Sequence, residues 1–138
     1  MEEPTERQNC DRIELRGCLE TIREFLDDYR TSVYAYNSKI RETGYYLKPV
    51  HKVYYKDSRG TKIIYEYYGV YWWKKQKRGY KIFLKYYGKQ KPEHLPEPPT
   101  NPLAGVVINH TEGTIIIPKY IFDKLKTRIS GCKARCLD

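Results

Sequence analysis

The sequence predicts an α+β fold: a long N-terminal helix, a three-stranded antiparallel meander, a proline-rich linker, and a C-terminal hairpin plus helix. Three observations predict it. The N-terminal part carries an apolar seam with heptad spacing, the middle carries aromatic runs separated by turn residues, and residues 89–103 hold five of the eight prolines. A chain of 138 residues suffices for one compact unit with three segments, 1–47, 48–91 and 92–138.

The N-terminal segment predicts one helix over roughly residues 12–42, after a disordered start at 1–9. Asp11 and Glu14 form a capping box, and Gly44 ends the helix. Apolar residues then recur in alternating steps of three and four: Leu15, Leu19, Ile22, Leu26, Tyr29, Val33, Tyr36 and Ile40. We expect this seam to join two copies of the chain, although it could also pack on the chain's own sheet. The predicted homodimer contacts are Leu19, Ile22, Leu26, Tyr29, Val33 and Tyr36.

The middle segment predicts three consecutive strands. The first covers Val50–Lys56 and turns at residues 57–60, and the second runs from Thr61 to about Trp73, with a bulge at Gly69. A basic turn at residues 74–79 leads to the third strand, residues 80–87. Alternation along the third strand predicts a buried face of Tyr80, Ile82, Leu84 and Tyr86, and a solvated face of Lys81, Phe83, Lys85 and Tyr87.

The C-terminal segment begins with the proline-rich residues 89–103, whose composition indicates a semi-rigid, extended linker. Val106–Asn109 and Thr114–Ile117 then form a short hairpin. Pro118 begins a helix that runs to about Ile129.

The positive charge is concentrated in the middle segment. Residues 48–91 hold 13 basic and two acidic residues, together with nine of the 15 tyrosines and both tryptophans, whereas residues 1–47 have a net charge of −3. Lysine and arginine neutralise phosphates, and aromatic rings stack on bases or sugars, so the pattern predicts nucleic-acid binding. The alternative is a solvated sheet whose lysines only block strand addition. The predicted phosphate contacts are Lys62, Lys74, Lys75, Lys77, Arg78, Lys81 and Lys85, and the predicted base or sugar contacts are Tyr65, Tyr67, Trp73 and Phe83.

Two resemblances add to this interpretation. The run from Tyr65 to Lys89 resembles a small module of archaeal and archaeal-virus proteins, with a layout similar to integrase arm-binding domains and ethylene-response factors. That resemblance implies a DNA-reading sheet with a helix behind it, but Tyr86-Tyr87 departs from the pattern. Residues 113–125 resemble the strand-Ile-Pro-helix signature of AbrB-like regulators, although Phe122 replaces the usual Arg. An ordinary hairpin and helix would also explain that second run.

No catalytic set or cofactor site is predicted. The three histidines are isolated, and no phosphate loop or nucleophile elbow occurs. A tyrosine nucleophile would need an Arg/His cluster that the sequence does not assemble. Only Cys132 and Cys136 have a spacing typical of zinc ligands, which makes a site with four Cys ligands difficult to form. The sequence leaves open whether Cys10, Cys18, Cys132 and Cys136 are free, metal-bound or disulfide-bonded. Disulfides inside a cell are credible only for hyperthermophiles.

The expected protein is therefore a DNA-binding regulator from a thermophilic archaeon or one of its viruses, located in the cytoplasm of the archaeal or infected cell. Duplex DNA is the favoured partner, and no membrane, small-molecule substrate or enzymatic activity is expected. The alternatives are a structural or inhibitory protein that binds another protein, and a binder of RNA or single strands. The sequence does not distinguish these by motif.

Overall fold

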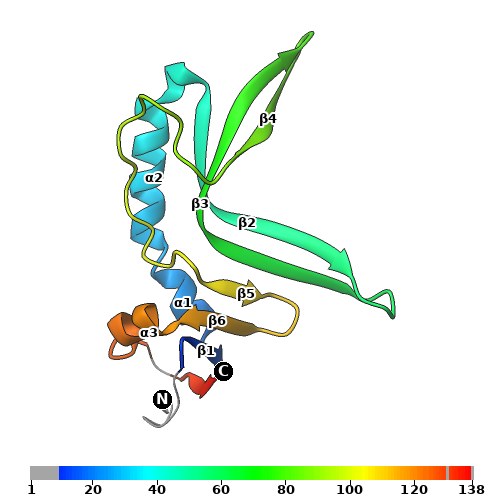
Figure 1. Cartoon of the computed structure of the whole chain (residues 1–138), viewed down its shortest axis with the longest axis vertical. Coiled ribbons are helices and arrows are strands. Elements are labelled where there is room, and N and C mark those ends of the chain that lie inside the picture. Colours follow the sequence, from blue (N-terminus) through cyan, green and yellow to red (C-terminus); the bar gives the residue numbers. More distant parts are fainter. Residues whose placement is uncertain (1–9, 130, 138) are drawn as a thin grey trace.

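The computed structural model describes residues 10–129 and 131–137 and is mostly sheet, with 43% strand and 23% helix. Seven antiparallel strands form one sheet (Figure 1). The predicted α+β arrangement with a separate three-stranded meander is therefore wrong, because the middle and C-terminal strands belong to the same sheet. The expected disorder of residues 1–9 lies outside the described residues.

The predicted N-terminal helix is also wrong over its first turn, where Arg12–Arg16 form strand β1. Ile13 and Leu15 are buried and their neighbours are more exposed, so this stretch has a strand's period of two. β1 pairs with β6 (Thr114–Pro118) and with β7 (Lys133–Cys136). These long-range pairings decide the conformation of a stretch that also fits the heptad spacing.

Helices α1 (Leu19–Glu24) and α2 (Asp27–Lys39) follow, and Leu26 between them keeps helical dihedral angles. A short 3-10 turn, η1 (Arg41–Thr43), then leads into the sheet. The apolar seam faces the chain's own core: Ile22, Leu26, Tyr29, Val33 and Tyr36 are buried, and Leu19 packs against them. This arrangement is the alternative to a seam that joins two copies, so the predicted dimer contacts are occupied by the chain's own core. Homodimerisation itself stays a prediction.

The sheet has the order β2-β3-β5-β6-β1-β7, with β4 paired to β3. Its remaining strands are β2 (Tyr45–Lys56), β3 (Lys62–Arg78), β4 (Lys81–Gly88) and β5 (Val107–Asn109). Trp72 pairs with Leu47 of β2 and with Gly88 of β4, so β2 and β4 lie on opposite edges of β3. β5 pairs with β3 on the same edge as β4 but nearer the start of β3, at Tyr65–Tyr67.

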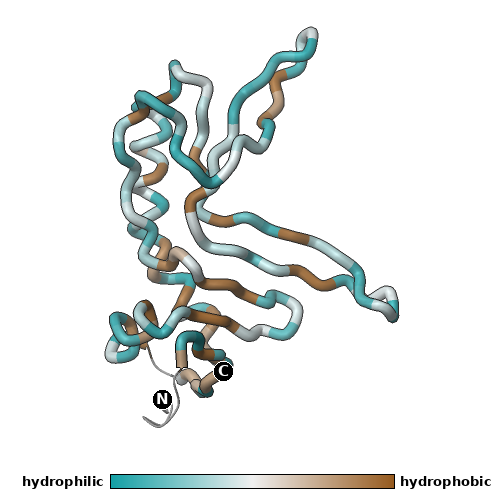
Figure 2. The backbone as a smooth tube through the Cα atoms, in the orientation of Figure 1, coloured by the Kyte–Doolittle hydropathy of each residue, from teal (hydrophilic) through white to brown (hydrophobic). Residues whose placement is uncertain are grey.

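Two hairpin arms consequently leave the body in different directions, the β2–β3 arm (residues 51–67) and the β3–β4 arm (residues 72–88) (Figure 1). The apolar positions gather in the body along β5 and β6, whereas the two arm tips are mostly hydrophilic (Figure 2). A larger core cluster fills the space between α1, α3 and strands β1, β5 and β6, and a smaller one contains Tyr36, Leu47, Trp72 and Leu95. The arms therefore extend beyond the cores that stabilise the fold.

The proline-rich segment does not extend away from the body as a linker. It runs along α2, where the hydroxyls of Tyr36 and Tyr29 donate hydrogen bonds to the carbonyls of Pro96 (2.7 Å) and Pro99 (3.4 Å). Asn101 is buried and donates to the carbonyls of Pro49 and Gly69, at 3.2 and 2.8 Å. The segment thus joins the helix to the middle of the β2–β3 pair.

The chain ends with helix α3 (Lys119–Leu125), shorter than predicted, and with β7. Two disulfides, Cys10–Cys136 and Cys18–Cys132, connect the N-terminal strand region to the C-terminal one. Beside the second bridge, Gly17 has a φ of +85°, and a Cβ there would lie 3.0 Å from the Gly131 carbonyl oxygen. This close approach of two backbones requires glycine at position 17.

Candidate nucleic-acid interface

Short turns build both arms. In the β2–β3 arm, the Asp57 carboxylate accepts hydrogen bonds from the backbone N–H groups of Arg59 (2.8 Å) and Thr61 (2.9 Å), which fixes the predicted turn. In the β3–β4 arm, Gly79 and Tyr80 alone connect the strands, and Gly79 has a φ of +64°. The predicted basic turn at residues 74–79 is wrong, because residues 74–78 are paired in β3.

The β3–β4 arm is a two-stranded ribbon with a high density of positive charge. Six of its residues are basic and none is acidic: Lys74, Lys75, Lys77, Arg78, Lys81 and Lys85. The predicted buried face of β4 is wrong, since Tyr80 is fully exposed, Ile82 is 63% exposed and Tyr86 is 42% exposed. Beyond Trp72 and Trp73 at the start of the arm, every described residue from 74 to 83 is exposed, so both faces of the outer part of the ribbon are open to solvent.

The cations divide between the two faces of the β3–β4 arm. Lys75 and Lys77 share the face of Trp73, because they occupy alternate positions of β3. On the opposite face, Lys74 pairs with Lys85, and Arg78 pairs with Lys81. There the Lys74 ammonium lies 4.8 Å from the centre of the Tyr45 ring, and the Arg78 guanidinium lies 5.7 Å from that of Phe83. Cation–π contact holds these two charged groups over rings while leaving them accessible.

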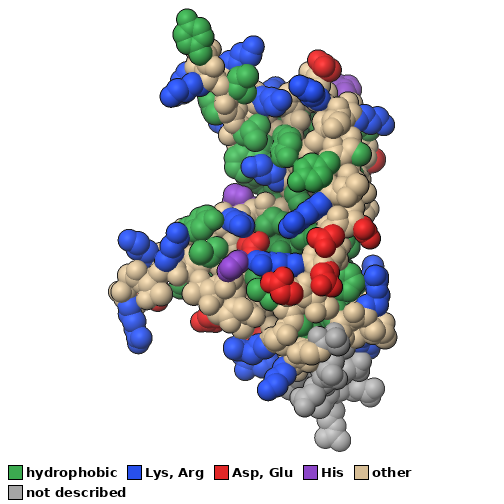
Figure 3. Space-filling view, turned by 180° about the vertical axis from the view of Figure 1, so that it is seen from behind, with side chains coloured by type: hydrophobic (Ala, Val, Ile, Leu, Met, Phe, Trp, Pro, Cys, Tyr) green, Lys and Arg blue, Asp and Glu red, His purple; other side chains and the backbone are tan. Residues whose placement is uncertain are grey.

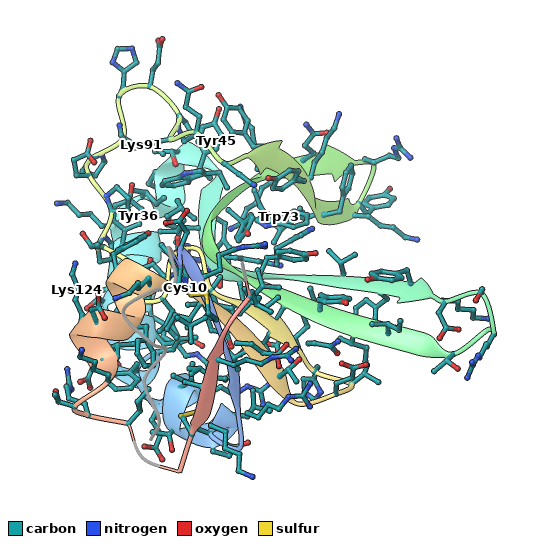
Figure 4. All side chains as sticks on the ribbon, turned by 60° about the horizontal axis from the view of Figure 1, so that its bottom comes forward. Cys10, Tyr36, Tyr45, Trp73, Lys91 and Lys124 are labelled. Atoms are coloured by element: carbon teal, nitrogen blue, oxygen red, sulfur yellow. A yellow bond between two sulfur atoms is a disulfide. The ribbon has the colours of Figure 1, made fainter. Side chains whose placement is uncertain are left out.

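Four aromatic side chains meet where the arms part, and we call them the ring cluster: His51, Tyr71, Trp73 and Tyr86. The His51 ring lies 5.3 Å from Tyr71 and 5.7 Å from Tyr86, and Trp73 lies 5.3 Å from Tyr86. The Lys48 ammonium lies 4.7 Å from the Trp73 ring centre. Figure 4 shows Trp73 at this junction. Because β2, β3 and β4 each contribute a ring, the cluster connects the bases of both arms.

A second group, the tyrosine row, follows the β2–β3 arm on the same face. Tyr55 stacks on Tyr65 with ring centres 5.4 Å apart, and Tyr65 stacks on Tyr67 at 6.2 Å. Tyr67 pairs with His51 in the strand register, so the row and the ring cluster share one face. A side-chain hydrogen bond with Tyr65 raises the pKa of Tyr55 to about 12. In the ring cluster, burial and the neighbouring Tyr86 and Tyr67 raise the pKa of Tyr71. These phenols therefore stay neutral at physiological pH and can donate hydrogen bonds.

Strands β2–β4 and their turns contain two acidic residues, and both already have partners. Asp57 is engaged in its turn, and Glu66 is buried on the opposite face, where it forms an ion pair with Arg23 of α1. The hydrogen bond and charge of Glu66 outweigh the effect of burial and raise the pKa of Arg23. Seen from behind, the molecule is hollowed between the arms, with hydrophobic and basic side chains along the hollow and acidic side chains on the body beside it (Figure 3).

The structure brings together some of the predicted contact residues and separates others. Tyr65, Tyr67 and Trp73 lie on the sheet face that carries the tyrosine row and the ring cluster, which we call the aromatic face. Phe83 lies on the far face of the β3–β4 arm. Lys62 lies near the tip of the other arm, with its ammonium 4.8 Å from the Tyr54 ring centre. Sequence reasoning missed four aromatic-face residues: His51, Tyr55, Tyr71 and Tyr86. These four residues could have been assigned to this face by combining strand alternation with the β2–β3 register on both sides of the bulge at Gly69.

Three comparisons bear on identity. No protein-family model, curated protein or solved structure matches this chain. The resemblances noted in the sequence therefore stay predictions. Within the described residues, no group of three or more His, Cys, Asp or Glu side chains is placed to hold a metal ion. None of the described helices combines the length and apolar character needed to cross a membrane.

Proposed function

We propose that this protein binds nucleic acid, with DNA as the expected ligand, through the two arms and the face between them. The observation that carries the proposal is the β3–β4 arm, which has six basic and no acidic residues on an exposed ribbon. A surface of one sign attracts a polyanion and releases its counterions on binding. The aromatic face supplies neutral rings and phenol hydroxyls beside these charges.

The stability of the ribbon supports the same conclusion. An isolated two-stranded hairpin is marginally stable in water. Here β4 pairs with β3 along one edge, and the described residues place no strand on its other edge. Phe83 and Tyr87 are 38% and 51% exposed in addition to Ile82. A bound polyanion would neutralise the mutual repulsion of the lysines and cover part of this exposed apolar surface.

The salt dependence of binding tests the proposal. If about four cations contact phosphates, log K should fall with log salt with a slope near −4 on duplex DNA. We expect the triple variant Lys75→Ala, Lys77→Ala, Arg78→Ala to flatten this slope by up to about three, because each lost phosphate contact removes roughly one unit. Gel shift or fluorescence anisotropy over a series of salt concentrations measures both slopes.

A matched control removes the same charge elsewhere. Lys39, Lys124 and Lys133 are exposed and lie outside the arms, so replacing all three with Ala should leave the slope nearly unchanged. Equal flattening by both triple variants would show that only net charge matters. Absence of binding to DNA and RNA at low salt would contradict the function itself and favour a protein partner.

A further inference from the structure

We infer that the preferred ligand is a single strand, whose bases stack on the tyrosine row and the ring cluster between the two arms. This inference rests on the proposed function and specifies its ligand. It differs from the sequence-based expectation of duplex DNA. The reason is the position and exposure of the rings, which only the folded chain shows.

The aromatic face is continuous from one arm to the other. It begins with Tyr55 on β2, continues through Tyr65 and Tyr67 of β3, and reaches Tyr86 of β4 through His51. An extended chain of nucleotides lying along this path would meet successive rings. Each base presents a flat π surface, so such a path accepts many sequences.

Parts of these rings are accessible. Tyr55 is 45% exposed, Tyr67 is 36% exposed, and Trp73 is half-buried. Their inner contacts with one another hold the rings in place, which lowers the entropy lost when a base stacks on them. The face is thus a preorganised stacking platform rather than a set of mobile side chains.

The lysines on the aromatic face are placed to contact the phosphate backbone of a single nucleic-acid strand. Lys48 lies over Trp73, and Lys75 and Lys77 follow Trp73 on the same side of β3. Of the two acidic residues of this region, Glu66 is paired with Arg23 behind the sheet, and the Asp57 carboxylate is bound to the N–H groups of its own turn at the arm tip. Phosphates of a strand stacked on the rings would therefore meet cations without repulsion from carboxylates.

A duplex cannot use this platform in the same way. Its bases are already paired and stacked, and its outer surface consists of sugars and phosphates. The rings lie on an open sheet face, along the β2–β3 arm and at the junction of the two arms, so stacking on them would require nucleobases that are unpaired. Stacking would consequently favour the single strand, while the cations alone attract both forms.

Direct competition tests the inference. We expect a 12-nucleotide oligo(dT) to bind at least about tenfold more tightly than a 12-base-pair duplex at the same salt concentration, because base–aromatic stacking adds to the phosphate contacts. Equal or tighter duplex binding, with the salt slope retained, would overturn the single-strand inference and leave the proposed function intact. Lack of any nucleic-acid binding would overturn both.

Paired variants locate the site. Replacing Tyr55 and Tyr67 together with Leu should weaken oligo(dT) binding at least about fivefold without changing the salt slope, because rings are lost and cations are kept. The matched control is Tyr54→Leu, since Tyr54 is 55% exposed on the opposite face of the same arm. Equal weakening by both variants would contradict the assignment of the face.

Fluorescence gives a second measurement that does not depend on a variant's affinity. Trp72 is fully buried, and Trp73 is the other tryptophan of the chain, within the ring cluster. A base stacked on the platform should quench the fluorescence of Trp73, and Trp73→Phe should abolish the quenching. Bound oligo(dT) that leaves the fluorescence of the wild type unchanged would show that the strand lies elsewhere.

Discussion

The two adjacent tryptophans of β3 show how strand alternation divides one aromatic run between core and surface. Trp72 is fully buried and its ring meets the edge of Tyr36, at 6.0 Å, in the smaller core cluster. Trp73 points to the other side and joins the ring cluster. Strand alternation predicts that the two tryptophans point to opposite faces of the sheet, but which one is buried depends on which face α2 covers. That choice is made by tertiary packing rather than by the residues themselves.

Tyr29 offers a test of burial at the residue scale. Its side chain is 5% exposed, and burial raises its pKa to about 12 from an ordinary value of 10. The folded chain therefore holds the phenolic proton more tightly than the unfolded chain, and stability present below pH 10 is lost as the pH rises toward 12. The full contribution of this group is at most about 3 kcal/mol.

We expect Tyr29→Phe to lose less of its unfolding free energy between pH 9 and pH 11 than the wild type does. Urea unfolding at several pH values measures the difference. Tyr34 is 66% exposed on the same helix, so Tyr34→Phe serves as the control and should keep the wild-type profile. Identical pH profiles for the Tyr29 variant and the wild type would show that its ionisation does not contribute.

At the scale of elements, β3 is the strand on which the molecule is organised. Its 17 residues pair with β2, β4 and β5, and a register shift in the β2 pairing separates Val50/Tyr68 from Lys48/Tyr71. The predicted bulge at Gly69 is confirmed at this shift. A Cβ at Gly69 would lie 3.4 Å from the Tyr71 ring, which covers that position. The bulge thus lets Tyr71 reach the ring cluster.

Asn37 protects the outer edge of the sheet. It is buried on α2, where its side chain donates to the Leu47 carbonyl (3.0 Å) and accepts from the Leu47 N–H (2.9 Å). It therefore satisfies a backbone position of the edge strand β2 in the way a neighbouring strand would.

Replacing Asn37 with Ala should leave both Leu47 groups without their partner and lower the unfolding free energy by about 2 kcal/mol. We also expect faster hydrogen exchange at the Leu47 amide. Chemical unfolding and amide exchange measure these effects, and Ser38→Ala, exposed on the same helix, is the control. Unchanged exchange at Leu47 would show that other groups protect this edge.

At the scale of the whole molecule, the sequence allowed the arms to be located but not the sheet. Strong local patterns, such as the turn at Asp57 and the alternating runs beside it, indicate hairpins whose strands are neighbours in the chain. The insertion of β5 beside β3, and the pairing of β1 with β6, bring together residues about 40 to 100 positions apart. Leu15 satisfies both a heptad and a strand, so only its distant partners decide between them.

The same limit applies to the interface and to the cysteines. The cations of the β3–β4 arm are visible in the composition, because they are close in sequence. The ring cluster could not be predicted in the same way, because its members come together only once the pairing register of β2, β3 and β4 is known. Likewise, the spacing of the four cysteines in the sequence did not decide whether they are free thiols, metal ligands or disulfide-bonded. In the folded chain, Cys10 is bonded to Cys136 and Cys18 to Cys132.

These disulfides enclose nearly the whole described chain, with separations of 126 and 114 residues. Cross-links that close loops of this length restrict the unfolded chain most, in the loop-entropy description. They also hold the four-residue β7 against β1, at the end of the sheet far from the arms. The bridges should therefore stabilise the body without touching the proposed interface.

We expect the variant Cys18→Ala, Cys132→Ala to lose about 2–5 kcal/mol of unfolding free energy, and Cys10→Ala, Cys136→Ala to lose a comparable amount. Urea unfolding of each variant and of the wild type measures these losses, and a thiol titration of the denatured wild type checks that both bridges are formed. While the variants remain folded, their affinity for oligo(dT) should equal that of the wild type, because the arms lie at the other end of the sheet. Stability that does not change when a bridge is removed would contradict its role in holding the body together, and an affinity that falls with an intact fold would show that β7 and the arms are coupled.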